Sequence, residues 1–245
     1  MILSIDFDII MSPIIQLYND LITPYDNRER NWDEIFYVRK IENLLSFDKE
    51  IYEKINKILL ECFNQKKKIY IGRDHSSLLS VIAEYIKNKE INGPMEIINI
   101  DHHHDIYYNE DQIKNFTFYN YPCCGSWAGY LDNLNLLKKY YWINNSTSLD
   151  FFPLDNRDFL LNNLEITNIK DFEISSYDNI DFIYFCSSLS YIPPQYDDLF
   201  LFTLKLLIEK KEKNNGEIIY YNSSYNINVQ DPIKELIFNG GGTIC

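Results

Sequence analysis

The sequence has few of the residues that mark linkers, fibrous repeats or disordered tails. Its 245 residues include only eight glycines and eight prolines, and no stretch is rich enough in Ser, Gly and Pro to indicate a linker. No internal repeat is visible. Hydrophobic residues make up 46% of the chain, which is enough to bury a sizeable core. We therefore expect a single domain over residues 1–245.

Basic residues and long apolar runs are also scarce. The chain has 23 Lys and Arg against 36 Asp and Glu, a formal charge of −13, which disfavours nucleic acid as a partner. No apolar run approaches the ~18 residues of a membrane span. The first residues, MILSIDFDII, carry acids where a secretory signal has a basic start. We expect no nucleic-acid or membrane partner and a cytoplasmic location. The negative charge suits a cationic partner or metal, or serves solubility alone.

Cysteines are too few and too scattered for a disulfide framework or a structural zinc site. The count is odd and no C-x-x-C pair occurs, so we expect reduced thiols. The adjacent Cys123 and Cys124 allow a thiol nucleophile. A catalytic thiol needs a histidine partner, and all four histidines belong to two other short segments with a different expected role. We therefore expect these cysteines to be buried residues without a catalytic role. The five cysteines are Cys62, Cys123, Cys124, Cys186 and Cys245.

Short apolar segments alternate with longer amphipathic ones along the chain. This alternation predicts an α/β fold: a three-layer, doubly wound, mostly parallel sheet with helices on both faces. The expected strands are residues 1–5, 67–71, 95–100, 140–143, 180–188 and 216–222. The expected helices are residues 12–22, 48–64, 76–89, 126–139 and 197–213.

The chain has only four histidines, and all lie in two short stretches. His75 is in IGRDHSS and the other three are in NIDHHHDI, and each stretch follows an expected strand. Ligands of such sheets bind beyond the carboxyl ends of the strands. Because alternate side chains of extended backbone point the same way, Asp101, His103 and Asp105 are expected to face one point. His102 and His104 would face away or line the pocket wall.

Asp6 and Asp8 repeat this alternate spacing after the first expected strand. Together the candidates supply four carboxylates and two imidazoles, a set that suits Mn²⁺ or another octahedral ion better than a thiolate-type zinc site. Two divalent ions would balance the four negative charges. Alternatively, Asp6 and Asp8 form a turn or cap a helix. Asp74 is expected to form structural hydrogen bonds. The predicted ligands are Asp6, Asp8, His75, Asp101, His103 and Asp105.

Three segments resemble motifs of the arginase, agmatinase and deacetylase superfamily. IGRDHSS resembles the family's Gly-Gly-Asp-His-Ser segment, and NIDHHHDI resembles its Asp-Ala-His-x-Asp segment. SIDFDIIMSP is similar to the Ser-Phe-Asp-x-Asp segment, but the family carries that motif late in the chain. The late segment FIYFCSSLSYIPP offers Cys186 and Ser188 instead. Either the first strand takes the place of the family's late strand, or the second metal position is lost. The cost of unpaired buried charge favours the first alternative.

The early Asp-x-Asp is similar to the arrangement in the UPF0489 group and the peptide arginases related to it. This resemblance implies an arginase-like fold and two Mn²⁺ ions per chain. It implies that His75 and Asp105 bind one ion and that His103 and Asp8 bind the other. Asp101 and Asp6 would bridge the two ions.

The resemblance also implies the reaction, which is hydrolysis of a guanidino group. The substrate would be an arginine-containing peptide, converted to ornithine and urea, or a small guanidino compound. Asp105 would orient a metal-activated water, and His104 or a water would protonate the leaving amine. Ser188, Ser190 and Tyr191 either contact the substrate or belong to a proline turn. The alternatives are a zinc-dependent, deacetylase-like amidohydrolase and a non-catalytic metal-binding protein.

Overall fold

A seven-stranded sheet forms the centre of the molecule. The computed structural model describes residues 1–12, 32, 46–106, 125–148, 163–177, 179–188, 191–214 and 216–221. The strand order is β7-β6-β5-β1-β8-β4-β9, and every neighbouring pair is parallel. The strands are β1 (Ile2–Asp6), β4 (Lys68–Gly72), β5 (Met95–Ile100), β6 (Leu137–Asn144), β7 (Leu164–Asn168), β8 (Phe182–Cys186) and β9 (Ile218–Tyr220).

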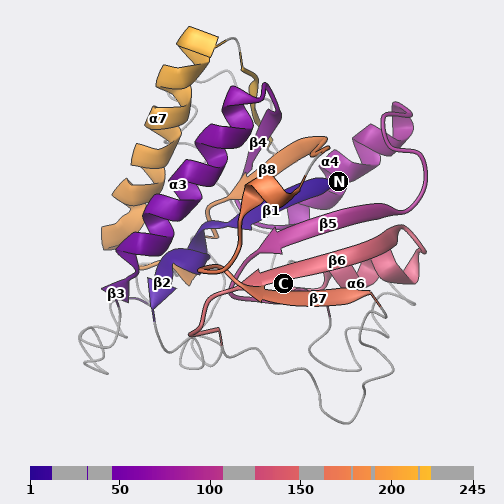
Figure 1. Cartoon of the computed structure of the whole chain (residues 1–245), viewed down its shortest axis with the longest axis horizontal. Coiled ribbons are helices and arrows are strands. Elements are labelled where there is room, and N and C mark those ends of the chain that lie inside the picture. The colour runs from indigo at the N-terminus through magenta and orange to yellow at the C-terminus, as the bar shows by residue number, and fades with distance from the viewer. Residues whose placement is uncertain are drawn as a thin grey trace.

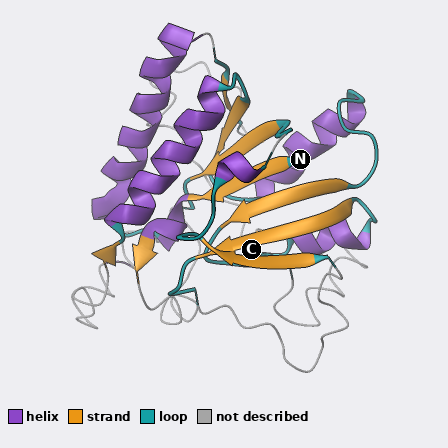
Figure 2. Ribbon diagram, viewed as in Figure 1, coloured by secondary structure: helices purple, strands orange, loops and turns teal. Residues whose placement is uncertain are grey.

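Helices cover both faces of this sheet, which confirms the predicted three-layer α/β fold (Figures 1 and 2). On one face, α3 (Lys49–Asn64) and α7 (Asp197–Asn214) share a hydrophobic cluster with alternate sheet residues. On the other face, α4 (Ser76–Lys87) and α6 (Trp127–Asn133) pack on a second cluster. Short 3-10 turns are η1 (Phe7–Ile10), η6 (Ile174–Ser176) and η8 (Pro194–Tyr196). Among the described residues, no helix has the length and apolar character needed to cross a membrane.

The register of β1 fixes which residues meet at the carboxyl edge of the sheet. Although first in the chain, β1 lies between β5 and β8 (Figure 1). Ile5 pairs with Ile100, and Asp6 pairs with Cys186. Continuing the first pairing by one residue places Asp6 beside Asp101. Because side chains alternate between faces, these strand ends share the side of the sheet on which Ile2 packs against the α4 and α6 cluster.

Two expected boundaries were wrong by three or more residues, because a helix stops early between them. The helix expected over residues 126–139 ends at Asn133, and β6 starts at Leu137, before the expected residue 140. Asn135 adopts φ of +56°. Its N–H bonds to the Asp132 carbonyl, and the Leu136 N–H bonds to the Leu131 carbonyl. This pattern is a Schellman motif with asparagine in the left-handed position, which ends the helix six residues early.

Some short elements were not expected from the sequence. β2 (Met11–Ser12) pairs antiparallel with β3 (Ser46–Phe47), and β7 forms the sheet edge next to β6. The helix expected over residues 12–22 starts at a residue of β2, and the rest of it lies outside the described residues. α3 begins where expected, because the Asp48 carboxylate accepts hydrogen bonds from the Glu50 and Ile51 N–H groups.

Candidate metal centre

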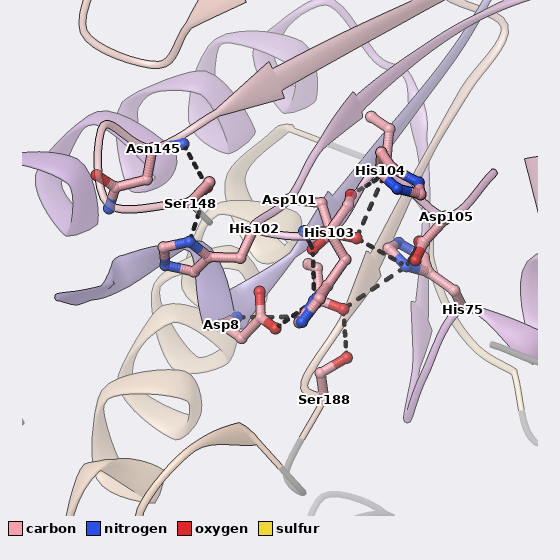
Figure 3. Close-up of polar contacts among 12 residues, drawn as sticks. Asp8, His75, Asp101, His102, His103, His104, Asp105, Asn145, Ser148 and Ser188 are labelled. Carbon is pink, nitrogen blue, oxygen red and sulfur yellow. Dashed lines mark hydrogen bonds and ion pairs between the residues drawn. The ribbon is translucent and has the colours of Figure 1, made fainter. Parts of the chain in front are cut away.

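All six predicted ligands come together at the carboxyl edge of the central strands, and Figure 3 labels all of them except Asp6. β1 and η1 supply two of them, the β4–α4 junction supplies one, and the segment after β5 supplies three. Each is at most 8% exposed. Five of them form two groups that share Asp101 and whose ligand atoms lie within 4.8 Å of one another, and Asp6 belongs to a third group with His75 and Cys186. The two groups that share Asp101 are His75 with Asp101 and Asp105, and Asp8 with Asp101 and His103.

The first group gathers around the Nδ1 atom of His75. This atom lies 2.9 Å from Asp105 Oδ2, 3.2 Å from Asp101 Oδ2 and 3.6 Å from Asp6 Oδ2. Donors bonded to one ion at ~2.0–2.2 Å lie roughly 3–4 Å from one another. The spacing of these atoms is therefore that of a coordination shell.

The second group lies on the other side of Asp101. His103 Nδ1 is 3.3 Å from Asp8 Oδ2 and 3.4 Å from Asp101 Oδ1. Asp101 thus turns one oxygen toward each group, which is the geometry of a bridging carboxylate. Asp6 Oδ2 faces His75, while Asp6 Oδ1 accepts a hydrogen bond from the Asp8 N–H at 3.1 Å. Asp6 therefore also caps η1, so the capping alternative and a ligand role are compatible.

Neighbouring polar groups orient these candidate ligands. Ser4 Oγ lies 2.8 Å from His75 Nε2, Asn99 Nδ2 donates to Asp101 Oδ2 at 3.3 Å, and Trp127 Nε1 donates to Asp105 Oδ2 at 2.7 Å. Such outer contacts fix the orientation of metal ligands. None of these three contacts was predicted from the sequence. Ser4 and Asn99 each precede a ligand by two residues, so the strand period could have identified them.

Burial and mutual repulsion make the site electrostatically unfavourable unless positive charge enters it. Burial, with the charges of Asp8 and Asp101, raises the pKa of Asp6. Burial and the Asp101 charge raise the pKa of Asp105 to about 8. Although burial opposes it, hydrogen bonds with His103 and His75 hold the pKa of Asp101 well below its usual range.

The imidazoles respond to the same excess of negative charge. Burial alone would lower the pKa of His75 and His103, but their acidic neighbours raise both above the ordinary value. His102 differs, because burial lowers its pKa. A cation bound by deprotonated ligands would take the place of the protons that this site retains.

Orphaned polar atoms support the fit of a metal ion. Among the described residues, neither carboxylate oxygen of Asp8 has a hydrogen-bond partner, and neither does His103 Nε2. All three atoms are buried. Unsatisfied buried polar groups are costly, and within the described part of the chain the Asp8 carboxylate has only an ion-pair contact with His103. The two unpartnered Asp8 oxygens, beside His103 Nδ1, therefore fit a divalent cation.

The remaining histidines of the cluster point elsewhere, as the alternate spacing predicted. His102 Nε2 lies 2.7 Å from the Met11 carbonyl, and its Nδ1 lies 2.9 Å from Ser148 Oγ. His104 is fully buried, and its Nδ1 accepts a hydrogen bond from the Ile106 N–H. Neither histidine belongs to a ligand group among the described residues. Proton donation by His104 stays a prediction.

Other candidates border the site or lie outside the described residues. Ser188 donates a hydrogen bond to Asp6 Oδ2, and the Tyr191 ring lies 4.7 Å from the His103 ring, centroid to centroid. The Asp74 carbonyl accepts a hydrogen bond from the Tyr184 hydroxyl. Its carboxylate joins none of the ligand groups among the described residues. Cys123, Cys124 and Ser190 lie outside the described residues.

Comparisons of the chain with protein-family models, curated proteins and solved structures find no match.

Proposed function

We propose that this protein is a metal-dependent hydrolase that cleaves a guanidino group. The substrate is an arginine residue of a peptide, and the products are ornithine and urea. The observation that carries this proposal is the pair of buried Asp/His groups that share Asp101. Six residues with oxygen or nitrogen donors at the carboxyl edge of the sheet suit two Mn²⁺ ions. When bound, such ions would lower the pKa of a water molecule and so supply the nucleophile for the guanidinium carbon.

The chain's own residues perform the remaining tasks. The chain's net charge of −13 attracts the cationic guanidinium, and Asp105 is held in place by Trp127 and His75. The reaction breaks one carbon–nitrogen bond, and the departing amine needs a proton. A water molecule is the simpler donor of that proton, because His104 is fully buried and faces away from the ligand groups.

The assay incubates Mn²⁺-loaded protein with an arginine peptide, free arginine, agmatine and an acetyl-lysine peptide. The arginine peptide should release urea and lose the mass of cyanamide per converted residue, measured by mass spectrometry. His103→Ala should abolish this turnover, whereas Asp74→Asn, a neighbouring carboxylate outside the ligand groups, should retain it. Loss of acetyl without urea would establish the deacetylase-like alternative. No change in any substrate would favour the non-catalytic alternative.

The second metal position has its own test. Asp8→Asn removes one negative charge from the group of Asp8, Asp101 and His103 and keeps the side-chain volume. Bound Mn²⁺, measured by elemental analysis after gel filtration, should fall from two ions per chain to about one. Asp74→Asn should keep both ions. Retention of both ions by the Asp8 variant would show that the early Asp-x-Asp pair does not form a metal site.

A further inference from the structure

Cys186 lies at the metal centre, although no motif of the sequence includes it. It is the last residue of β8 and pairs in register with Asp6 on one side and Gly72 on the other. Its side chain is fully buried. The sulfur, a carboxylate oxygen of Asp6 and a ring nitrogen of His75 lie within 4.8 Å of one another.

The surroundings of Cys186 differ from those of an ordinary buried cysteine. Cys62 is equally buried, but it lies on α3 within the hydrophobic cluster beneath α7. The Cys186 sulfur has polar neighbours instead: the Ile5 carbonyl at 3.7 Å and Ser188 Oγ at 3.9 Å. It also completes a group with one imidazole and one carboxylate, and His75 belongs to the first ligand group as well. A packing role alone does not require a thiol at this position.

We infer that Cys186 is a metal ligand on the His75 side of the centre, together with His75 and Asp6. The inference rests on the metal binding of the proposed function and deepens it. Binding breaks the S–H bond, releases the proton to solvent and forms a sulfur–metal bond, without any change of oxidation state. The two metal positions then differ in chemistry. The group of Asp8, Asp101 and His103 has only oxygen and nitrogen donors, which suit Mn²⁺.

A sulfur donor shifts the metal preference of the His75 position toward softer ions such as Zn²⁺ or Co²⁺. The protein would therefore hold two different metals when both kinds are present. The sequence predicted two equal Mn²⁺ positions and not this difference, because the cysteine belongs to a strand that carries none of the recognised motifs.

Cobalt provides the test, because thiolate bonded to Co²⁺ gives a charge-transfer absorption in the near ultraviolet. Full-length metal-free protein is titrated with Co²⁺ while absorption and bound cobalt are both measured. The wild-type protein should develop the band. Cys186→Ser should lose it and bind Co²⁺ at the His75 side about 10-fold or more weakly. Cys62→Ser, the matched buried cysteine remote from the centre, should keep the band.

A measurement without any variant covers the case in which Cys186→Ser fails to fold. X-ray absorption of the Zn²⁺-loaded wild-type protein should show a sulfur neighbour at ~2.3 Å. Bound cobalt without the band, or a band that survives Cys186→Ser, would overturn the inference. These outcomes are separate from the proposed reaction, because urea release with Mn²⁺ is measured independently. Failure to bind any of the three ions would overturn both.

Discussion

At the scale of single residues, Asp105 depends on contacts that are far away in the sequence. Its carboxylate accepts the Trp127 indole hydrogen bond at 2.7 Å and contacts His75. Its carbonyl accepts a hydrogen bond from the Ala128 N–H at 3.0 Å, and its φ is +54°. A left-handed backbone costs energy for a residue other than glycine. The first turn of α6 therefore holds this candidate ligand in a conformation that it would not adopt alone.

Trp127→Phe tests that support. The variant keeps an aromatic ring in the fully buried position and removes the donor to Asp105 together with part of the buried ring volume. We expect metal affinity on the His75 side to fall about 10- to 100-fold, as for other outer contacts of metal ligands. Isothermal titration with Mn²⁺ measures this change.

Trp142→Phe is the matched control, because its indole N–H donates to the Asp101 carbonyl rather than to a carboxylate. It should lower thermal stability with a smaller effect on metal affinity. Equal loss of affinity in both variants would mean that general loosening, and not the bond to Asp105, explains the effect.

Residue types and spacing were sufficient to predict the six candidate ligands. Each lies at or just after a strand end, where acids and histidines have no simple packing role, and the structure brings them together. Trp127 could not be predicted, because 22 residues separate it from Asp105 and aromatic residues are common in this chain. Cys186 was noted only as the residue found where the family has an aspartate. Its contact with His75 depends on which strands are neighbours.

At the scale of elements, a buried polar network fixes the segment that carries Asp8. The Asn145 amide donates to the Ile9 carbonyl at 3.1 Å and to the Met11 carbonyl at 3.4 Å. His102 contacts the Met11 carbonyl from β5's end, and Ser148 contacts His102 (Figure 3). The turn after β6 and the segment after β5 thus bind the η1–β2 segment from two sides.

Asn145→Ala should therefore act on the second metal position without touching a ligand. Loss of the amide leaves the buried Ile9 and Met11 carbonyls with fewer donors, at about 1–3 kcal/mol of stability, and frees the Asp8 segment. Bound Mn²⁺ should fall toward one ion per chain at limiting metal, and excess Mn²⁺ should restore the second. Asn92→Ala, an exposed amide at the opposite end of the sheet, is the control. An unchanged binding isotherm would exclude this positioning role.

The β4–α4 junction depends on a close approach that only glycine permits. A Cβ atom at Gly72 would collide with the hydroxyl and ring of Tyr184, a fully buried side chain that bonds to the Asp74 carbonyl. Gly72→Ala should cost about 1–3 kcal/mol by overpacking and should weaken metal binding through the adjacent His75. Denaturant unfolding measures the first effect. Adding Tyr184→Phe removes the nearest clashing atom, so the double variant should lose less stability than the sum of the single changes.

At the scale of the whole molecule, the sequence indicated the layers but not the order of the strands. The run ILSI is apolar enough for a strand buried on both faces, yet nothing local shows that it inserts between β5 and β8. That placement is a long-range property, because it depends on pairings about 95 and 180 residues away in the chain. It is also what brings the early Asp-x-Asp pair beside His75 and Asp101.

The same placement concentrates titratable groups, so the stability of the metal-free protein should depend on pH in a defined direction. Asp105 has a pKa of about 8 in the folded protein and roughly 3.9 in an unfolded chain. Between these values the unfolded chain gives up a proton that the folded protein keeps, so stability falls as pH rises. The raised pKa values of Asp6, His75 and His103 act in the same direction. Asp101 has a lowered pKa, so its contribution to the stability of the folded state is lost only at acid pH.

We therefore expect the melting temperature of the metal-free protein to decrease from about pH 5 to about pH 8. Mn²⁺ binds the deprotonated ligands and stabilises the folded state by mass action, so its stabilising effect should grow over the same range. Thermal melts with chelator or with Mn²⁺ at several pH values measure both trends. Asp105→Asn should flatten the slope of the metal-free protein, and Asp171→Asn, an exposed aspartate beyond β7, should not. A Mn²⁺ shift that is the same at every pH would contradict binding by these buried acids, because their protons would then not compete with the metal.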